Sequence, residues 1–273
     1  MPFAENGFLG KEALRMAEQI KTTHRELLNL CYEINSFAQR LKSDFEIHED
    51  PQEFLAASFF IRVLESAQAT IILVEHGLES EASTILRSMF EALIYLKRCV
   101  NEVDFPKKYM QYGEIKSLDN LKAILHYKLY EKYEKFRGEE GTKKMISEIE
   151  ERFSSQGINI GKFKSDFSKK KNAENAGMLE LYNSFYSVTS DSAHTGLGAL
   201  EKHLPLNEDG KIIEIAHGPS DKEAGMHLTA IAEFILYASG YACDFFKIDK
   251  TQEIEKYHKQ LKEINSRLCN STG

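Results

Sequence analysis

The stretch from Glu12 to Phe45 contains neither Pro nor Gly, and its apolar side chains recur at the helical spacing i, i+3, i+4. This spacing places them on one face of an α-helix, so the sequence predicts a long N-terminal helix over residues 1–46. The whole chain of 273 residues has only 5 Pro and 16 Gly. Such a composition argues against an all-β sandwich with many turns and favours a helical fold.

Helical periodicity continues through most of the chain. Asp50, Pro51 and Glu53 have the pattern of an N-cap, N1 and N3, which predicts the start of a second helix that ends at Gly77. Further helices are expected over residues 81–100, 104–136, 142–153, 178–203, 221–246 and 249–268, with a long loop over 154–176.

A single segment has the pattern of β-structure. Asp209-Gly210 lies between the apolar residues of 204–206 and 212–215, which predicts a small β-hairpin near 204–216. We therefore predict an all-α bundle of about seven to eight helices with one small β-hairpin. It is expected to be a single domain over residues 1–273, with the core bundle over 51–247.

Composition limits where the protein acts. Hydrophobic residues make up 42% and charged residues 28% of the chain, as in ordinary globular proteins. No membrane span is predicted, and residues 1–5 lack the pattern of a secretory signal. The cysteines are scattered without a C-x-x-C pair, which favours reduced thiols: Cys31, Cys99, Cys243 and Cys269. We expect a cytoplasmic protein that does not associate with a membrane.

The charge distribution is uneven. The net charge is −7, yet residues 107–171 carry 16 basic and 10 acidic side chains, a local charge of +6. This segment ends in five lysines, Lys162, Lys164, Lys169, Lys170 and Lys171. They predict either a footprint for RNA phosphates or, as is more common for charge runs, a solvated helix face, because glutamates are interleaved upstream.

Common catalytic motifs are missing from the sequence. It contains no G-x-x-x-x-G-K-[ST] phosphate loop, no dinucleotide-binding G-x-G-x-x-G, no H-E-x-x-H and no G-x-S-x-G. A ferritin-like diiron site needs two E-x-x-H motifs on helices, and only one such motif of this chain, from Glu255 to His258, lies in a predicted helix. No metal and no cofactor are therefore predicted.

A first polar cluster lies in the segment from Glu81 to Glu91. Arg87 and Glu91 are spaced i,i+4, so they share one helix face and can pair. That face adjoins apolar residues, and buried charges are costly unless they are paired. The pair is therefore predicted to be either a structural contact or part of a functional site.

A second polar cluster lies in residues 182–196. Ser190 and His194 are spaced i,i+4, Asp191 and His194 are spaced i,i+3, and Tyr186 lies one turn before Ser190. The two readings are a satisfied polar network between helices and a small site in which His194 acts as acid or base.

These residues carry a resemblance. The pattern E-A-x-x-x-x-R-S-x-x-E, followed much later by Y-x-x-x-S-x-x-x-H, resembles a bacterial all-helical family of unknown function, domain of unknown function family 5677. The resemblance spans roughly residues 54–246, and the family brings no assigned reaction. Its anchors here are Glu81, Arg87, Glu91, Tyr186, Ser190 and His194.

A looser analogy is to the HEPN superfamily, helical bundles that are often ribonucleases in toxin–antitoxin and antiviral systems and are usually completed across a dimer interface. Their R-x(4–6)-H motif on one helix is absent here. By this analogy His194 is the acid or base for attack by a ribose 2′-OH, Arg87 stabilises the phosphorane charge and Glu91 orients Arg87. Ser190 or Asp191 sets the tautomer of His194.

Two functions are left open by the sequence. One is a metal-independent, HEPN-like endoribonuclease that acts as a toxin or antiviral-defence effector, with RNA as partner. The other is a non-catalytic interaction or regulatory module, whose long helices form a homodimer or bind a partner protein and whose polar clusters are structural. A small-molecule-binding bundle is a third possibility with no sequence signature. Whether Arg87, Glu91 and His194 converge in one open pocket distinguishes the first two.

Overall fold

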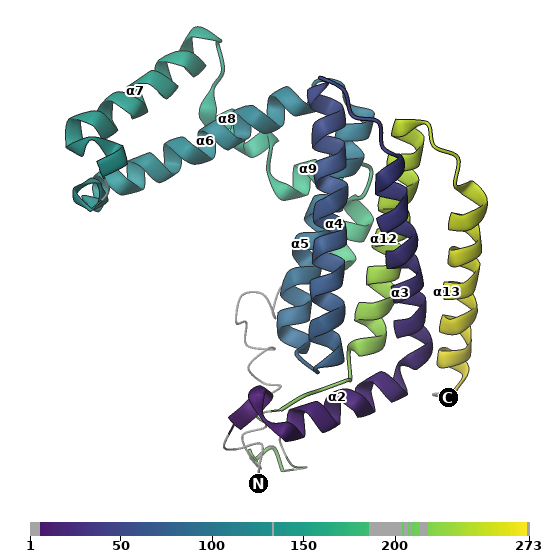
Figure 1. The fold of residues 1–273 in the computed structure, drawn as a ribbon. Helices are drawn as coiled ribbons and strands as arrows, with labels where there is room; N and C mark the ends of the chain where they lie inside the picture. Colours follow the sequence, from purple (N-terminus) through teal and green to yellow (C-terminus); the bar gives the residue numbers. More distant parts are fainter. Residues whose placement is uncertain are drawn as a thin grey trace. The chain divides into compact units, whose positions relative to one another are not determined.

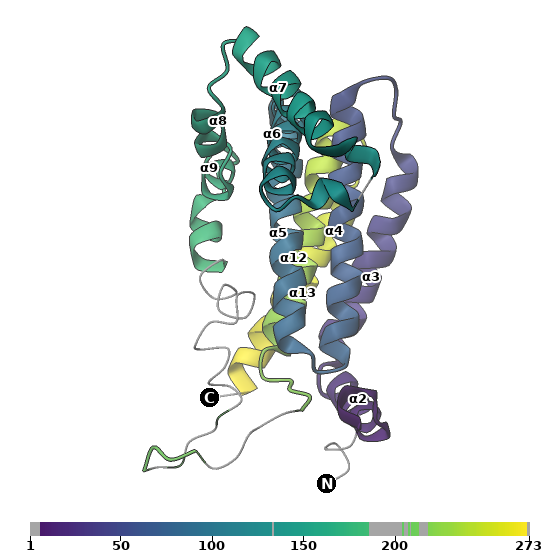
Figure 2. The ribbon, with the colours of Figure 1, turned by 90° about the vertical axis from the view of Figure 1, so that its left-hand side faces the viewer.

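The computed structural model describes residues 6–132, 134–185, 204, 207, 209–212 and 218–271 (Figures 1 and 2). The chain divides into two compact units, Met1–Asn101 together with Met178–Gly273, and Glu102–Gly177. The described residues are overwhelmingly helical, which confirms the all-α class. That the two units form one domain stays a prediction.

The first unit is a bundle of long helices, in which α12 packs against α3, α4 and α5, and α13 packs against α3 and α12 (Figure 1). Helices α4 and α5, which follow each other in the chain, pack closely against each other. The helices of this unit are α2 (Lys11–Thr23), α3 (Arg25–Leu41), α4 (Pro51–Glu75), α5 (Glu79–Asn101), α12 (Ala224–Phe246) and α13 (Thr251–Ser271).

Both ends of α4 follow from the sequence. The Asp50 side chain accepts a hydrogen bond from the Gln52 N–H and Pro51 occupies the first turn, as predicted. At the other end Gly77 has φ +69°, and the N–H of Leu78 donates to the Leu73 carbonyl at 2.9 Å. This is a Schellman stop, which requires a residue that tolerates the left-handed region.

Helix α4 is long and apolar enough to cross a membrane, judged by length and composition alone. Its most apolar window has a mean hydropathy of 1.5, and 56% of that window is buried inside the protein. The core helix of a soluble bundle has the same properties, so this finding is only a weak indication of a membrane span.

The long N-terminal helix predicted over 1–46 is wrong in one respect, because it breaks at His24 into α2 and α3. His24 departs from helical geometry with φ −102° and ψ 21°. The preceding Thr22 Oγ1 donates to the Glu18 carbonyl at 2.8 Å, a bond of the kind that bends helices. The two adjacent threonines are also weak helix formers.

The second unit departs further from the sequence prediction. The helix expected to reach residue 136 ends at His126, where Lys128 takes a left-handed φ of +53°. Residues 154–176, expected as a loop, contain two short helices whose first turns are capped by the Asn159 and Ser168 side chains. The helices of this unit are α6 (Phe105–His126), α7 (Gly138–Ser155), α8 (Ile160–Asp166) and α9 (Lys169–Asn175). The described ranges therefore contain more helices than predicted.

The predicted β-hairpin near 204–216 is not seen. The described residues of this segment form a turn in which the Asn207 side chain accepts from the N–H of Asp209 and Lys211, with an isolated bridge at Ile212 but no strand. Ile212 is 58% exposed. An isolated two-stranded hairpin is only marginally stable in water, and the exposed Ile212 contributes little burial to stabilise one.

Candidate functional site

Helix α5 places Arg87 and Glu91 one turn apart, as the sequence predicts. Arg87 is buried, with 9% of its surface exposed, and Glu91 is half-buried. One turn further along, the Tyr95 hydroxyl donates to Glu91 Oε1 at 3.1 Å. The Glu91 carboxylate therefore accepts from a phenol one turn later and lies within electrostatic range of the guanidinium one turn earlier.

The electrostatics of this cluster show which other residue lies beside it. Burial lowers the pKa of the Arg87 guanidinium, and interactions with Tyr182 and Glu91 oppose that shift. Burial also raises the pKa of the Tyr182 phenol, and Arg87 lowers it. Tyr182 thus lies within electrostatic range of Arg87 and Glu91 although it is far away in the sequence.

Tyr182 belongs to a helical stretch, residues 179–185, that aromatic packing holds against the first unit's core. The Phe185 ring contacts Phe90 of α5 at 5.2 Å and Phe234 of α12 at 5.2 Å between ring centroids. Phe90 and Phe234 are themselves stacked at 5.1 Å. The second polar cluster therefore begins beside α5, the helix that carries the first polar cluster.

Sequence reasoning missed Tyr182, although a signal for it exists. Tyr182, Tyr186, Ser190 and His194 are spaced by four residues each. Tyr186, Ser190, Asp191 and His194 lie outside the described residues, so the structure does not place the predicted acid or base.

Glu81 does not belong with Arg87. It is exposed on α5 and six residues away from Arg87, which corresponds to about 240° around a helix of 3.6 residues per turn. The two side chains therefore leave α5 on different faces. Glu81 is not brought to the Arg87–Glu91 cluster, contrary to its prediction as a site residue.

A second buried contact lies one turn before Arg87. Ser83 Oγ is 2.8 Å from Nε2 of His227 on α12, and both side chains are buried. Near them, the Glu79 carboxylate accepts a hydrogen bond from the backbone N–H of Glu223. His227 is fully buried. Its contact with Ser83 was not predicted from the sequence.

Together these contacts define a continuous feature, which we name the α5 polar row: Glu79, Ser83, Arg87, Glu91 and Tyr95. Its members follow one another at i,i+4, and all but the half-buried Glu91 are less than one-tenth exposed. A run of polar residues at this spacing on a core helix is visible in the sequence. It is the signal that could have found Ser83 and Tyr95.

Residues 53–212 match a family described as a family of unknown function, DUF5677. The match covers more than half of the chain. The chain belongs to the DUF5677 family. No curated protein and no solved structure matches it.

The DUF5677 region contains the whole α5 polar row, Tyr182 and the second polar segment, whereas His227 lies beyond it. It also contains all six residues on which the resemblance rests. The family itself assigns no reaction to any of them.

The DUF5677 region also includes the predicted RNA footprint, which consists of five lysines in the second unit, Lys162, Lys164, Lys169, Lys170 and Lys171. Lys164 Nζ lies 2.5 Å from Asp119 Oδ1, and Lys171 Nζ lies 2.8 Å from Glu174 Oε2. Lys162, Lys169 and Lys170 are exposed. At least two of the five lysines therefore take part in ion pairs, and three of the five are exposed to solvent.

In the part of the chain that the structure describes, no group of three or more His, Cys, Asp or Glu side chains is arranged to hold a metal ion. The site that the structure supports best is the cluster of Arg87, Glu91 and Tyr182, because it combines a buried guanidinium with the first residue of the second polar cluster.

Proposed function

We propose that the chain is a metal-independent, HEPN-like endoribonuclease that acts as a toxin or antiviral-defence effector in the cytoplasm. The observation that supports this proposal is the proximity of Tyr182 to Arg87 and Glu91. Because of this proximity, the second polar cluster, residues 182–196, begins beside the helix that carries the buried arginine. An active site assembled from the two polar clusters requires such an arrangement.

The chemistry follows from the residue types. His194, acting as base, removes the proton of a ribose 2′-OH, and the 2′ oxygen attacks the adjacent phosphorus. The P–O5′ bond breaks, leaving a 2′,3′-cyclic phosphate, and the departing 5′ oxygen takes up a proton from water to become a 5′-hydroxyl. Arg87 stabilises the negative charge on the phosphorane, and Glu91 and Tyr182 orient the guanidinium. Ser190 or Asp191 sets the tautomer of His194.

Arg87 is suited to this role because its surroundings favour an anion. A guanidinium with 9% exposure has lost most of its water, and Glu91 must also accept from Tyr95. A phosphodiester that reaches Arg87 would supply charge-assisted hydrogen bonds in a site of low dielectric, where they are stronger than in water. Lys162, Lys169 and Lys170 would contribute phosphate contacts outside this site.

The test compares RNA cleavage and growth arrest for the wild type and two variants, His194→Ala and Arg87→Lys. The proposal expects both variants to lose cleavage and arrest. Arg87→Lys keeps the charge but loses the planar fork that binds phosphate bidentately. The exposed residues His126 and Arg62 give matched controls, His126→Ala and Arg62→Lys, which should cleave like the wild type.

Thermal stability is measured for every variant, so that loss of activity through unfolding is recognised. Wild-type protein that neither cleaves RNA nor arrests growth would refute the proposal, as would a stable His194→Ala variant with full activity.

The alternative is a non-catalytic interaction or regulatory module, which the burial of the α5 polar row favours. Glu79, Ser83 and Glu91 all have hydrogen-bond partners within the bundle, as structural polar groups do. In this case the wild type fails to cleave RNA. Retrieval of a specific partner protein or formation of a stable homodimer would then support the module, and Arg87→Lys would act through stability alone.

A further inference from the structure

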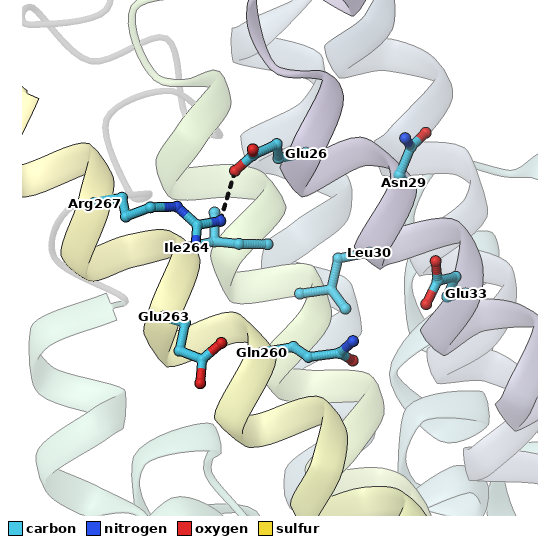
Figure 3. A pocket seen from close by; sticks show the side chains of 8 residues that line it. All are labelled: Glu26, Asn29, Leu30, Glu33, Gln260, Glu263, Ile264 and Arg267. Carbon is cyan, nitrogen blue, oxygen red and sulfur yellow. Dashed lines mark hydrogen bonds and ion pairs between the residues drawn. The ribbon is translucent and has the colours of Figure 1, made fainter.

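A groove between α3 and α13 in the first unit takes no part in the proposed function. Its cavity volume is about 280 Å³, and eight residues line it: Glu26, Asn29, Leu30, Glu33, Gln260, Glu263, Ile264 and Arg267 (Figure 3). The two helices run antiparallel, so Arg267 lies opposite Glu26 at one end and Gln260 opposite Glu33 at the other (Figure 3). From the matched positions of these residues, the groove extends over two helical turns, about 10 Å.

One end of the groove is closed by an ion pair. Arg267 Nη2 lies 2.8 Å from Glu26 Oε2, and this hydrogen bond, together with the charges of Glu26 and Glu263, raises the pKa of Arg267. Arg267 is the only cation among the lining residues, against three carboxylates. Glu33 and Glu263 therefore give the groove an excess of negative charge.

Beyond the carboxylates, the groove offers another hydrogen-bond acceptor and an apolar floor. Gln260 Oε1 is buried from solvent and has no hydrogen-bond partner among the described residues. Figure 3 shows the Gln260 side chain extending from α13 toward α3. Leu30 and Ile264 are only 4% and 9% exposed and form the floor. A buried acceptor without a donor is costly, so a ligand that donates to it is favoured.

The spacing of the acceptors argues against a compact ion. Among the described residues, no three acidic or other metal-ligating side chains are close enough to hold a metal ion together. A complementary ligand must instead carry separated N–H donors, positive charge and an aliphatic part that covers Leu30 and Ile264. We propose that the groove between α3 and α13 binds a linear aliphatic polyamine.

In this arrangement an ammonium group donates to Glu33 and Gln260, another donates to Glu263, and the methylene chain packs on the floor. Charge-assisted hydrogen bonds of this kind are stronger than those between neutral groups. Arg267 stays on Glu26 and limits the length of ligand that the groove accepts. The proposal does not depend on the ribonuclease activity, because none of the lining residues belongs to the Arg87 cluster.

The experiment titrates the full chain with spermidine in low salt by calorimetry. Saturable binding at one site per chain is expected, and the double variant Glu33→Gln with Glu263→Gln should weaken it about tenfold or more. A matched double variant, Glu49→Gln with Glu255→Gln, removes the same charge from exposed positions outside the groove and should change the affinity less than about twofold.

Two further measurements distinguish binding in the groove from nonspecific attraction of a polycation to an acidic protein. Gln260→Leu removes the buried acceptor without changing charge and should also weaken spermidine, while its thermal midpoint shows whether the bundle is intact. N-acetyl-lysine methylamide carries a single ammonium group and should bind about tenfold more weakly than spermidine. Equal loss in both double variants, equal binding of the two ligands, or no saturable binding would overturn the proposal.

Discussion

The Arg87–Glu91 pair allows a quantitative test of whether its two charges interact across a partly desolvated space. The perturbation is a double-mutant cycle made of Arg87→Met, Glu91→Gln and the double variant. Met keeps most of the length of the arginine stem, and Gln keeps an acceptor for the Tyr95 hydroxyl, which donates at 3.1 Å. Each single change therefore removes charge with little loss of packing.

The expected coupling free energy follows from how far Arg87 and Glu91 are buried. Exposed i,i+4 ion pairs couple only weakly because water and salt screen them. Arg87 is 9% exposed and Glu91 half-buried, so screening is reduced and the pair belongs to a network with Tyr182. We expect a coupling free energy of about 1–2 kcal/mol, in the range found for contacting residues in a shared network.

Urea unfolding of the four proteins gives the coupling energy, and thermal midpoints give a check, since about 1 kcal/mol shifts the midpoint of a domain of this size by about 2–4 °C. A matched control pair is Glu139–Lys143 on α7, also spaced i,i+4, with Nζ 2.7 Å from Oε1 and both side chains about half exposed. A coupling for Arg87–Glu91 no larger than that of the control pair would refute the reasoning.

Three other predictions use different parts of the structure. Gly77→Ala should lower stability by about 1 kcal/mol or more, because φ is +69° and a Cβ would lie 2.6 Å from that of Pro219. Gly113→Ala, in exposed helix with no atom within 4 Å, should instead raise stability by about 0.5–1 kcal/mol; chemical denaturation checks both, and equal signs would contradict the explanation. Burial raises the pKa of the Cys31 thiol to about 12 and also raises the pKa of the Cys99 and Cys243 thiols. N-ethylmaleimide should therefore label these three cysteines slowly in the native protein and rapidly in denaturant. Fast labelling of the native protein, measured for each cysteine by mass spectrometry, would contradict their burial. Burial also raises the pKa of Glu75, so the stability that its protonated carboxyl contributes is lost as the pH rises through the folded-state pKa. Glu75→Gln, whose amide oxygen can still accept from Tyr32, should therefore be at least as stable as the wild type at pH 7, and the difference should disappear in acid. A variant that is less stable than the wild type at every pH would contradict this.

The sequence predicted correctly those features that depend only on residues close together in the chain. The periodicity and cap around Asp50 and Pro51 determine where α4 begins, and i,i+4 spacing determines that Arg87 and Glu91 share a face. The break at His24 was missed, because a helical apolar period continues across it and the bond from Thr22 to Glu18 leaves no trace in that period. The hairpin near 204–216 was predicted from the Asp209-Gly210 turn and the apolar residues on both sides of it, and neither pattern shows what surface the hairpin would pack against.

Contacts between distant segments could not be predicted in the same way. Ser83 and His227 are 144 positions apart, and their contact depends on how α12 packs against α5. Tyr182 lies near Arg87 because Phe185 packs against both Phe90 and Phe234. Periodicity shows that a helix has a buried face, but not which residues of another helix cover that face.

The two proposed functions predict different changes in stability when the charges of the α5 polar row are replaced by apolar side chains. A core helix is generally more stable with apolar residues than with buried charges, since the cost of desolvation often exceeds the gain from pairing. If the row serves catalysis, replacing Arg87 by Met and Glu91 by Leu should leave stability unchanged or raise it while RNA cleavage is lost. If the row is a structural network that fixes how α5, α12 and residues 179–185 pack, the same replacement should reduce the cooperativity of unfolding, and no cleavage would be present to lose.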